Sequence, residues 1–95
     1  MAKVARASEV KKFTDIPNVG KAVADKLVML NLKSPQELKT KDAFALYTKL
    51  NKLTGMRHDP CLLDTFIAAI DFMNGAPAKP WFYYTKDRKK KYPNL

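Results

Sequence analysis

The clearest prediction of local structure comes from one stretch, which reads Phe13-Thr14-Asp15-Ile16-Pro17-Asn18-Val19-Gly20-Lys21-Ala22-Val23-Ala24-Asp25-Lys26-Leu27. Ile16 and Val19 are apolar residues on either side of a Pro-Asn pair, and we expect them to fasten a turn to the core. Gly20 is expected to supply backbone freedom and a close approach that a side chain would block. The first N–H groups of the helix that follows have no partner inside that helix, so they can donate to a phosphate oxygen. Lys21 adds a positive charge beside them.

Helical periodicity and end signals predict the elements around this turn. Val23, Leu27 and Leu30 recur at the i, i+4, i+7 spacing of one helix face, and Asn31 ends that helix. Further helices are expected at Ser34-Pro35-Gln36-Glu37 through about Lys39, between Asp42 and Leu53 with Thr54-Gly55 as its end, and from the cap Asp59-Pro60 to Asn74-Gly75. No alternating strand pattern of useful length is present. The sequence therefore predicts an all-α fold, a compact bundle of about five short helices.

Three segments together resemble a known family. They are Ile16-Pro17-Asn18-Val19-Gly20, the stretch from Leu53 to Asp64, and Pro80-Trp81-Phe82. They are similar to small bacterial helix-hairpin-helix proteins labelled as pathogenicity-locus or mitomycin-resistance proteins, over about residues 10–85. The resemblance implies a SAM-domain-like fold with a helix-hairpin-helix motif and a presumed DNA-binding role, but no established reaction or ligand. Asn18 stands where the family usually has Gly; Asn best tolerates a left-handed backbone among the other residues, and its side chain would lie near an approaching phosphate.

Length and charge limit the classes of function. A chain of 95 residues makes one domain, and 18 basic against 9 acidic residues give a formal charge of +9. The net charge is +3 over residues 1–12, +1 over 13–78 and +5 over 79–95. We therefore divide the chain into a helical helix-hairpin-helix domain, residues 1–78, and an aromatic then basic C-terminal tail, residues 79–95. A strongly basic balance favours a polyanionic partner, and nucleic acid is the one we expect.

Other features of the sequence concern compartment and chemistry. No run approaches the roughly 18 apolar residues of a membrane span, and the N-terminus has no apolar segment of a secretory signal. One cysteine excludes an internal disulfide framework and fits a reducing compartment, so we expect a cytoplasmic protein with no membrane contact. With one histidine, no Gly-rich phosphate loop and no carboxylate pair of evident raised pKa, we expect no enzyme and no cofactor. Asp64 and Asp71 share a polar helix face and are expected to be solvated.

His58 and Cys61 allow two interpretations. They could ligate zinc together with Asp59 and Asp64, or the helix N-terminus could lower the pKa of the Cys61 thiol. In the structural interpretation Asp59 caps the helix, His58 hydrogen-bonds in the loop, and Cys61 is a small buried hydrophobe. We favour the structural interpretation and expect no metal site.

The C-terminal segment combines rings and charges. The basic run Lys86-Asp87-Arg88-Lys89-Lys90-Lys91 is either a solvated tail or a phosphate-binding segment beside aromatic faces on which bases stack. We expect Trp81 and Phe82 to fold back onto the helices, and Tyr83, Tyr84 and Tyr92 to be exposed. Phe44 lies off the stripe of its helix and is expected to pack against a neighbouring helix or a second subunit.

The sequence thus favours a nucleic-acid-binding module of low sequence specificity, with DNA as the partner that the resemblance implies. The candidate contacts are the hairpin residues Asn18, Val19, Gly20, Lys21 and Ala22 and the basic residues Arg88, Lys89, Lys90 and Lys91. The alternative is a protein-interaction or homodimerisation domain in which the hairpin is only a structural corner and the charge serves solubility.

Overall fold

The computed structural model describes residues 4–95, and the regular secondary structure in this part of the chain is entirely helical, without strands. The α-helices are α1 (Lys21–Met29), α2 (Ala43–Thr54), α3 (Pro60–Met73) and α4 (Thr85–Lys91). The 3₁₀-helices are η1 (Ala7–Glu9), η2 (Phe13–Asp15), η3 (Pro35–Thr40) and η4 (Trp81–Tyr84). The all-α prediction is confirmed. Among the described residues no helix combines the length and the apolar character needed to cross a bilayer.

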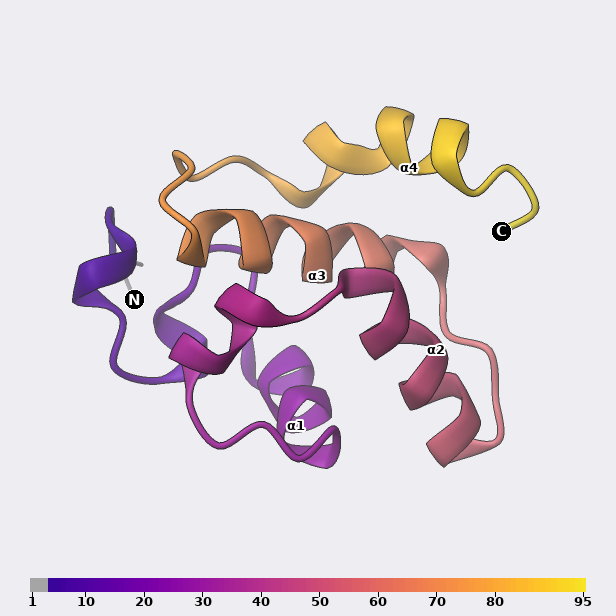
Figure 1. The fold of residues 1–95 in the computed structure, drawn as a ribbon, viewed down its shortest axis with the longest axis horizontal. Helices are drawn as coiled ribbons and strands as arrows, with labels where there is room; N and C mark the ends of the chain where they lie inside the picture. The colour runs from indigo at the N-terminus through magenta and orange to yellow at the C-terminus, as the bar shows by residue number, and fades with distance from the viewer. Residues whose placement is uncertain (1–3) are drawn as a thin grey trace.

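Helix α3 is the centre of the molecule. Figure 1 shows α4 along one side of α3, with α1 on the opposite side and α2 at one end. Leu63, Phe66 and Phe72 of α3 are buried, and they join the core formed by residues of α1, α2, η3 and the turn before α1. A helix that is apolar around most of its circumference must be covered on several sides. The central position of α3 follows from that composition.

Local signals in the sequence place the helix ends correctly. The Asp59 carboxylate accepts a hydrogen bond from the Cys61 N–H (2.8 Å) at the start of α3, with Pro60 in the first helical position. At η3 the Glu37 carboxylate accepts a hydrogen bond from the Ser34 N–H (2.8 Å). Helix α2 ends at Thr54 and is capped by Gly55, whose φ of 70° lies in the left-handed region that glycine adopts without strain.

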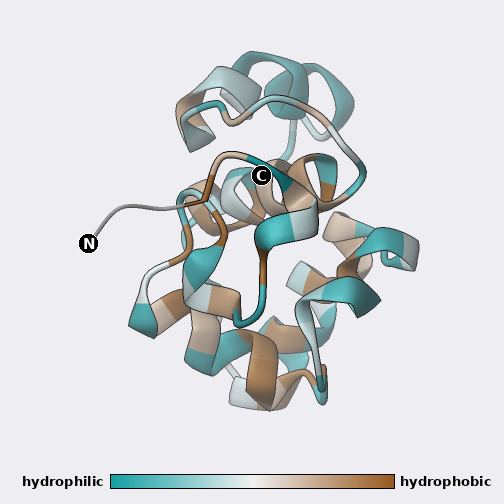
Figure 2. Cartoon of the chain, turned by 90° about the vertical axis from the view of Figure 1, so that its left-hand side faces the viewer, coloured by the Kyte–Doolittle hydropathy of each residue, from teal (hydrophilic) through white to brown (hydrophobic). Residues whose placement is uncertain are grey.

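The segment 79–95 contains regular structure that sequence patterning did not indicate. Helix η4 and helix α4 follow one another, and α4 runs beside α3 in the opposite chain direction (Figure 1). Figure 2 shows α4 as a largely hydrophilic helix at the top of the molecule, with the hydrophobic residues concentrated in the elements below it. A mainly polar helix of this kind needs specific contacts to hold it against α3. From the sequence, we expected the residues that make these contacts to be in solvent.

Asp64 was expected to be solvated, and this expectation is wrong. Its side chain is fully buried, and its carboxylate accepts hydrogen bonds from the Arg88 Nε (2.9 Å) and from the Thr85 hydroxyl (2.7 Å). Arg88 is itself only 6% exposed. Helix α4 covers the polar face of α3 at this point, so a face that is polar in sequence lies at an internal contact.

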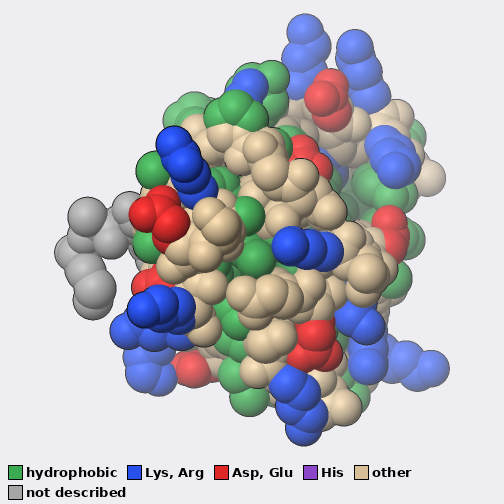
Figure 3. Space-filling view, turned by 60° about the vertical axis from the view of Figure 1, so that its left-hand side comes forward, with side chains coloured by type: hydrophobic (Ala, Val, Ile, Leu, Met, Phe, Trp, Pro, Cys, Tyr) green, Lys and Arg blue, Asp and Glu red, His purple; other side chains and the backbone are tan. Residues whose placement is uncertain are grey.

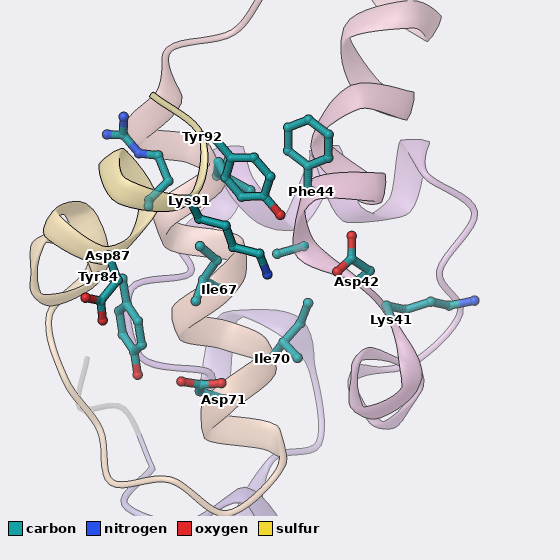
Figure 4. A pocket seen from close by; sticks show the side chains of 13 residues that line it. Lys41, Asp42, Phe44, Ile67, Ile70, Asp71, Tyr84, Asp87, Lys91 and Tyr92 are labelled. Atoms are coloured by element: carbon teal, nitrogen blue, oxygen red, sulfur yellow. The ribbon is translucent and has the colours of Figure 1, made fainter. Parts of the chain in front are cut away.

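Three aromatic assignments also differ from the structure, those of Tyr84, Phe82 and Tyr92, of which Tyr92 was expected to be exposed but is half-buried. Tyr84 was expected to be exposed but is buried, because its side chain points from η4 toward Asp71 of α3 (Figure 4). Phe82 was expected to fold back onto the helices but is 64% exposed, and Tyr83 is exposed as predicted. Phe44 packs within the chain, where its ring stacks on that of Tyr92 with 4.2 Å between centroids.

Candidate nucleic-acid interface

The turn formed by residues 16–20, called the 16–20 turn below, is fastened to the core as the sequence predicts. Ile16 and Val19 are both fully buried, and the Val19 N–H donates a hydrogen bond to the Ile16 carbonyl (3.1 Å). Asn18 lies between them with a φ of 72°, in the left-handed region. The preceding element is the single 3₁₀ turn η2, so the segment before the turn is shorter than an α-helix.

Gly20 has a different role from the one expected. It is the N-cap of α1 with a φ of −93°, a conformation open to any residue, and a Cβ added there would meet nothing within 4 Å. The expectation that Gly20 supplies backbone freedom is therefore wrong, because the left-handed position of this turn is Asn18. Gly20 is exposed, so the space that it leaves open lies on the surface of the protein.

The first turn of α1 presents backbone donors. The first hydrogen bond of this helix runs from the Ala24 N–H to the Gly20 carbonyl (2.9 Å), so the amides of Lys21 and Ala22 precede the intrahelical ladder. No acidic residue stands in the first turn. The Lys21 side chain is 86% exposed and pairs with Asp25 across 2.9 Å. An exposed pair one helical turn apart is weak, so the Lys21 ammonium remains able to turn toward another anion.

The basic C-terminal residues fall into two groups. Lys89, Lys90 and Lys91 are exposed on α4, whereas Arg88 directs its guanidinium to Asp64 through Nε (2.9 Å) and a terminal nitrogen (3.1 Å). These hydrogen bonds raise the pKa of Arg88 further above its usual value. Arg88 therefore anchors α4 and is not part of the exposed basic surface.

The structure does not bring the two predicted groups of site residues together. Helices α1 and α4 lie on opposite sides of α3 (Figure 1). Figure 3 shows Lys and Arg side chains distributed over one face of the molecule with Asp and Glu between them. On this face the positive charge is dispersed among acidic groups, and α3 separates α1 from α4.

A connection that the sequence analysis missed joins the 16–20 turn to the C-terminal segment. The Asn18 side-chain amide donates to the Lys79 carbonyl (2.7 Å), and its side-chain oxygen accepts from the Trp81 N–H (3.2 Å). These partners are more than 60 residues apart in sequence, so no local signal could have indicated them. The side chain that was expected to stand near a phosphate is instead engaged with residues of the same chain.

A pocket of about 360 Å³ lies between α4, α3 and the start of α2. Figure 4 shows Phe44 and Tyr92 along one side of it, with Ile67 and Ile70 of α3 forming an apolar floor. Its charged residues balance, with Lys41, Arg88 and Lys91 against Asp42, Asp71 and Asp87. The balanced charge makes this pocket a poor site for a polyanion.

Comparison with known proteins agrees with the resemblance noted in the sequence. A family model described as pathogenicity locus matches residues 6–90. The chain belongs to the pathogenicity locus family. It is also similar to the mitomycin resistance protein McrB of Streptomyces lavendulae, with 37% identity over 84 residues that cover 88% of this chain and 80% of the relative. No solved structure matches the chain.

In this member of the pathogenicity locus family, His58 and Cys61 have structural contacts. The His58 Nδ1 lies 2.7 Å from the Asn51 side-chain oxygen, and the Tyr47 hydroxyl donates to the His58 carbonyl. A hydrogen bond to Asp59, and then burial, raise the pKa of the Cys61 thiol, which is the opposite of activation. Cys61 was expected to be buried, but its side chain is partly exposed. In residues 4–95 no group of three or more potential ligands is arranged to hold a metal ion.

Proposed function

We propose that this protein binds nucleic acid through its phosphate backbone, at the 16–20 turn and the first amides of α1. The observation that carries the proposal is the exposed first turn of α1, where the amides of Lys21 and Ala22 precede the helical ladder and no acidic residue stands in the turn. Backbone donors at a helix N-terminus, together with the helix dipole, favour a bound phosphate. The family resemblance supports DNA as the nucleic acid.

The proposed contacts hold position and read no sequence. Phosphate oxygens are the same at every base pair, so amide and lysine contacts of this kind give binding of low specificity. The net charge of +9 provides long-range attraction, to which the exposed lysines of α4 contribute from the other side of α3. The role we propose is binding without a catalysed reaction. The name of the relative refers to resistance to mitomycin and specifies no partner.

The test compares two lysines by fluorescence anisotropy with a labelled duplex of mixed sequence. Lys21→Ala should weaken binding and reduce the slope of log K against log salt by about 0.9, the effect of one lost phosphate contact. Lys52→Ala on α2 is the matched control, because Lys52 is also an exposed helical lysine and its removal changes the net charge equally. Equal effects of the two variants would contradict a site at the turn. If the parent binds neither this duplex nor a labelled single strand at low salt, the proposal itself is contradicted.

The contribution of α4 requires substitutions and not truncation. Removing residues after Tyr84 would also remove Arg88 and leave the buried Asp64 without its partner. Lys89→Gln with Lys90→Gln keeps that pair and removes two exposed charges. We expect the salt slope to fall by no more than about 1.8 and some duplex binding to persist near physiological salt. Complete loss of binding would instead place the site on α4.

A protein-interaction or homodimerisation role is the second candidate. Several large apolar side chains are exposed outside the proposed interface, namely Val28 (60%), Met29 (54%), Leu53 (56%) and Met56 (60%). Exposed apolar groups of this kind can belong to a contact between proteins. Sedimentation equilibrium with Met29→Lys separates the two candidates, because a dimer through α1 would dissociate in this variant while a monomeric parent would not change.

A further inference from the structure

Two aromatic side chains stand exposed on the segment that Asn18 holds. Phe82 is 64% exposed and Tyr83 is 55% exposed, and both belong to η4. The residue before them, Trp81, donates its backbone N–H to the Asn18 side-chain oxygen (3.2 Å). Phe82 is therefore adjacent in sequence to a residue that is hydrogen-bonded directly to the 16–20 turn.

The two rings differ in what surrounds them. Over Tyr83 lies the Lys79 ammonium, 4.0 Å from the ring centroid, and the Tyr84 ring approaches it edge to face at 5.2 Å. Phe82 has the Trp81 ring edge to face at 5.7 Å, and about two thirds of its surface remains in solvent. Tyr83 thus positions a cation, and Phe82 presents an aromatic surface that stays largely open to solvent among the residues that the structure describes.

This segment is held at both ends. Before the rings, Asn18 binds the backbone of Lys79 and Trp81; after them, Tyr84 is buried and Arg88 is paired with Asp64. The exposure of Phe82 therefore belongs to a fixed element and is not the chance position of a loose tail. A ring held in place loses little freedom when it receives a ligand, which favours binding.

We propose that Phe82 is a stacking platform for one unpaired base, with Lys79, whose ammonium lies over the ring of the adjacent Tyr83, as a phosphate contact, on a strand whose backbone continues onto the 16–20 turn. This inference rests on the proposed function and names its substrate class, single-stranded nucleic acid. In a duplex each base is stacked between neighbours and offers no free face. In a single strand every base has an accessible face, and aromatic stacking combined with a nearby cation is the usual means of holding it.

The test measures two ligands against two variants at one salt concentration. The ligands are a labelled single strand and a labelled duplex that contains the same strand. Phe82→Leu keeps an apolar side chain of similar size but removes the aromatic face, and it should weaken single-strand binding by about 5- to 150-fold. Duplex affinity should not change. Leu53→Ala is the control, because Leu53 is 56% exposed on α2 and its removal should affect neither ligand.

Further measurements separate the outcomes. Asn18→Gly retains a residue suited to the left-handed position but removes both hydrogen bonds to the aromatic segment, so it should lower single-strand affinity in the same direction as Phe82→Leu. Both RNA and DNA single strands offer unpaired bases and phosphates. Comparing the affinity for an RNA strand with that for a DNA strand of the same sequence shows which of the two the site prefers.

If the parent binds the duplex at least as tightly as the single strand and Phe82→Leu changes neither, the stacking platform is refuted while the proposed function stands. If neither ligand binds the parent at low salt, the proposed function itself fails.

Discussion

The ion pair between Arg88 and Asp64 gives the most informative test of the structure. Asp64 is fully buried and Arg88 is 6% exposed, and two hydrogen bonds of 2.9 and 3.1 Å join them. In Arg88→Met the Asp64 carboxylate would stay buried with the Thr85 hydroxyl (2.7 Å) as its remaining side-chain partner. Removal of one partner from a buried pair costs about 3–5 kcal/mol. That is a large share of the roughly 5–15 kcal/mol that stabilises an ordinary domain.

The assay is thermal and urea unfolding followed by circular dichroism. At roughly 4–8 °C per kcal/mol for a domain of this size, Arg88→Met should lower the melting temperature by at least about 12 °C. Lys89→Met is the matched control, since its side chain is exposed on the same helix and its replacement should change stability by less than about 0.5 kcal/mol. The double variant Asp64→Leu with Arg88→Met should recover most of the loss, because an apolar pair has no charge to desolvate. If Arg88→Met and Lys89→Met behave alike, α4 is not anchored through this pair.

The remaining predictions concern pKa values and the single thiol. Burial, and then the Asp71 charge and hydrogen bond, raise the pKa of Tyr84 to about 12. The contribution of neutral Tyr84 to the stability of the folded state is therefore complete below pH 10 and is lost as pH rises toward 12. Absorbance of tyrosinate should show one of the four tyrosines titrating last, and Tyr84→Phe should remove that phase. Cys61 should react with iodoacetamide more slowly than a model thiol at pH 8, and faster in Asp59→Asn, because the hydrogen bond to Asp59 raises its pKa; equal rates would disprove that contact. The Cys61 N–H lowers the pKa of Asp59, so its contribution to stability is present above its ordinary pKa and lost as pH falls, and Asp59→Asn should flatten the acid limb of a stability profile. Cys61→Ala should cost about 1 kcal/mol and leave the metal content of the purified protein unchanged, and stoichiometric zinc lost in this variant would contradict the structural role.

The sequence alone determined the helices α1, η3, α2 and α3 and where they end. Capping is chemistry among neighbours, so Asp59 with Pro60, and Glu37 reaching back to Ser34, could be recognised without knowledge of the fold. The buried positions of Ile16 and Val19 were also predictable, because apolar residues on both sides of a turn must point into the core. The resemblance to the pathogenicity locus family depends on the same local patterns.

Only the tertiary structure decided which polar side chains are internal and which aromatic side chains are exposed. Asp64 is polar on a helix face, and whether that face meets water or an arginine depends on a helix that begins 21 residues later. The exposure of Phe82 beside the 16–20 turn likewise depends on the hydrogen bond between Asn18 and Trp81, 63 residues apart. Periodicity reports which residues share a face but not what covers it. The covering element is selected by packing and hydrogen bonding over the whole chain, and that selection leaves no trace in a local window of sequence.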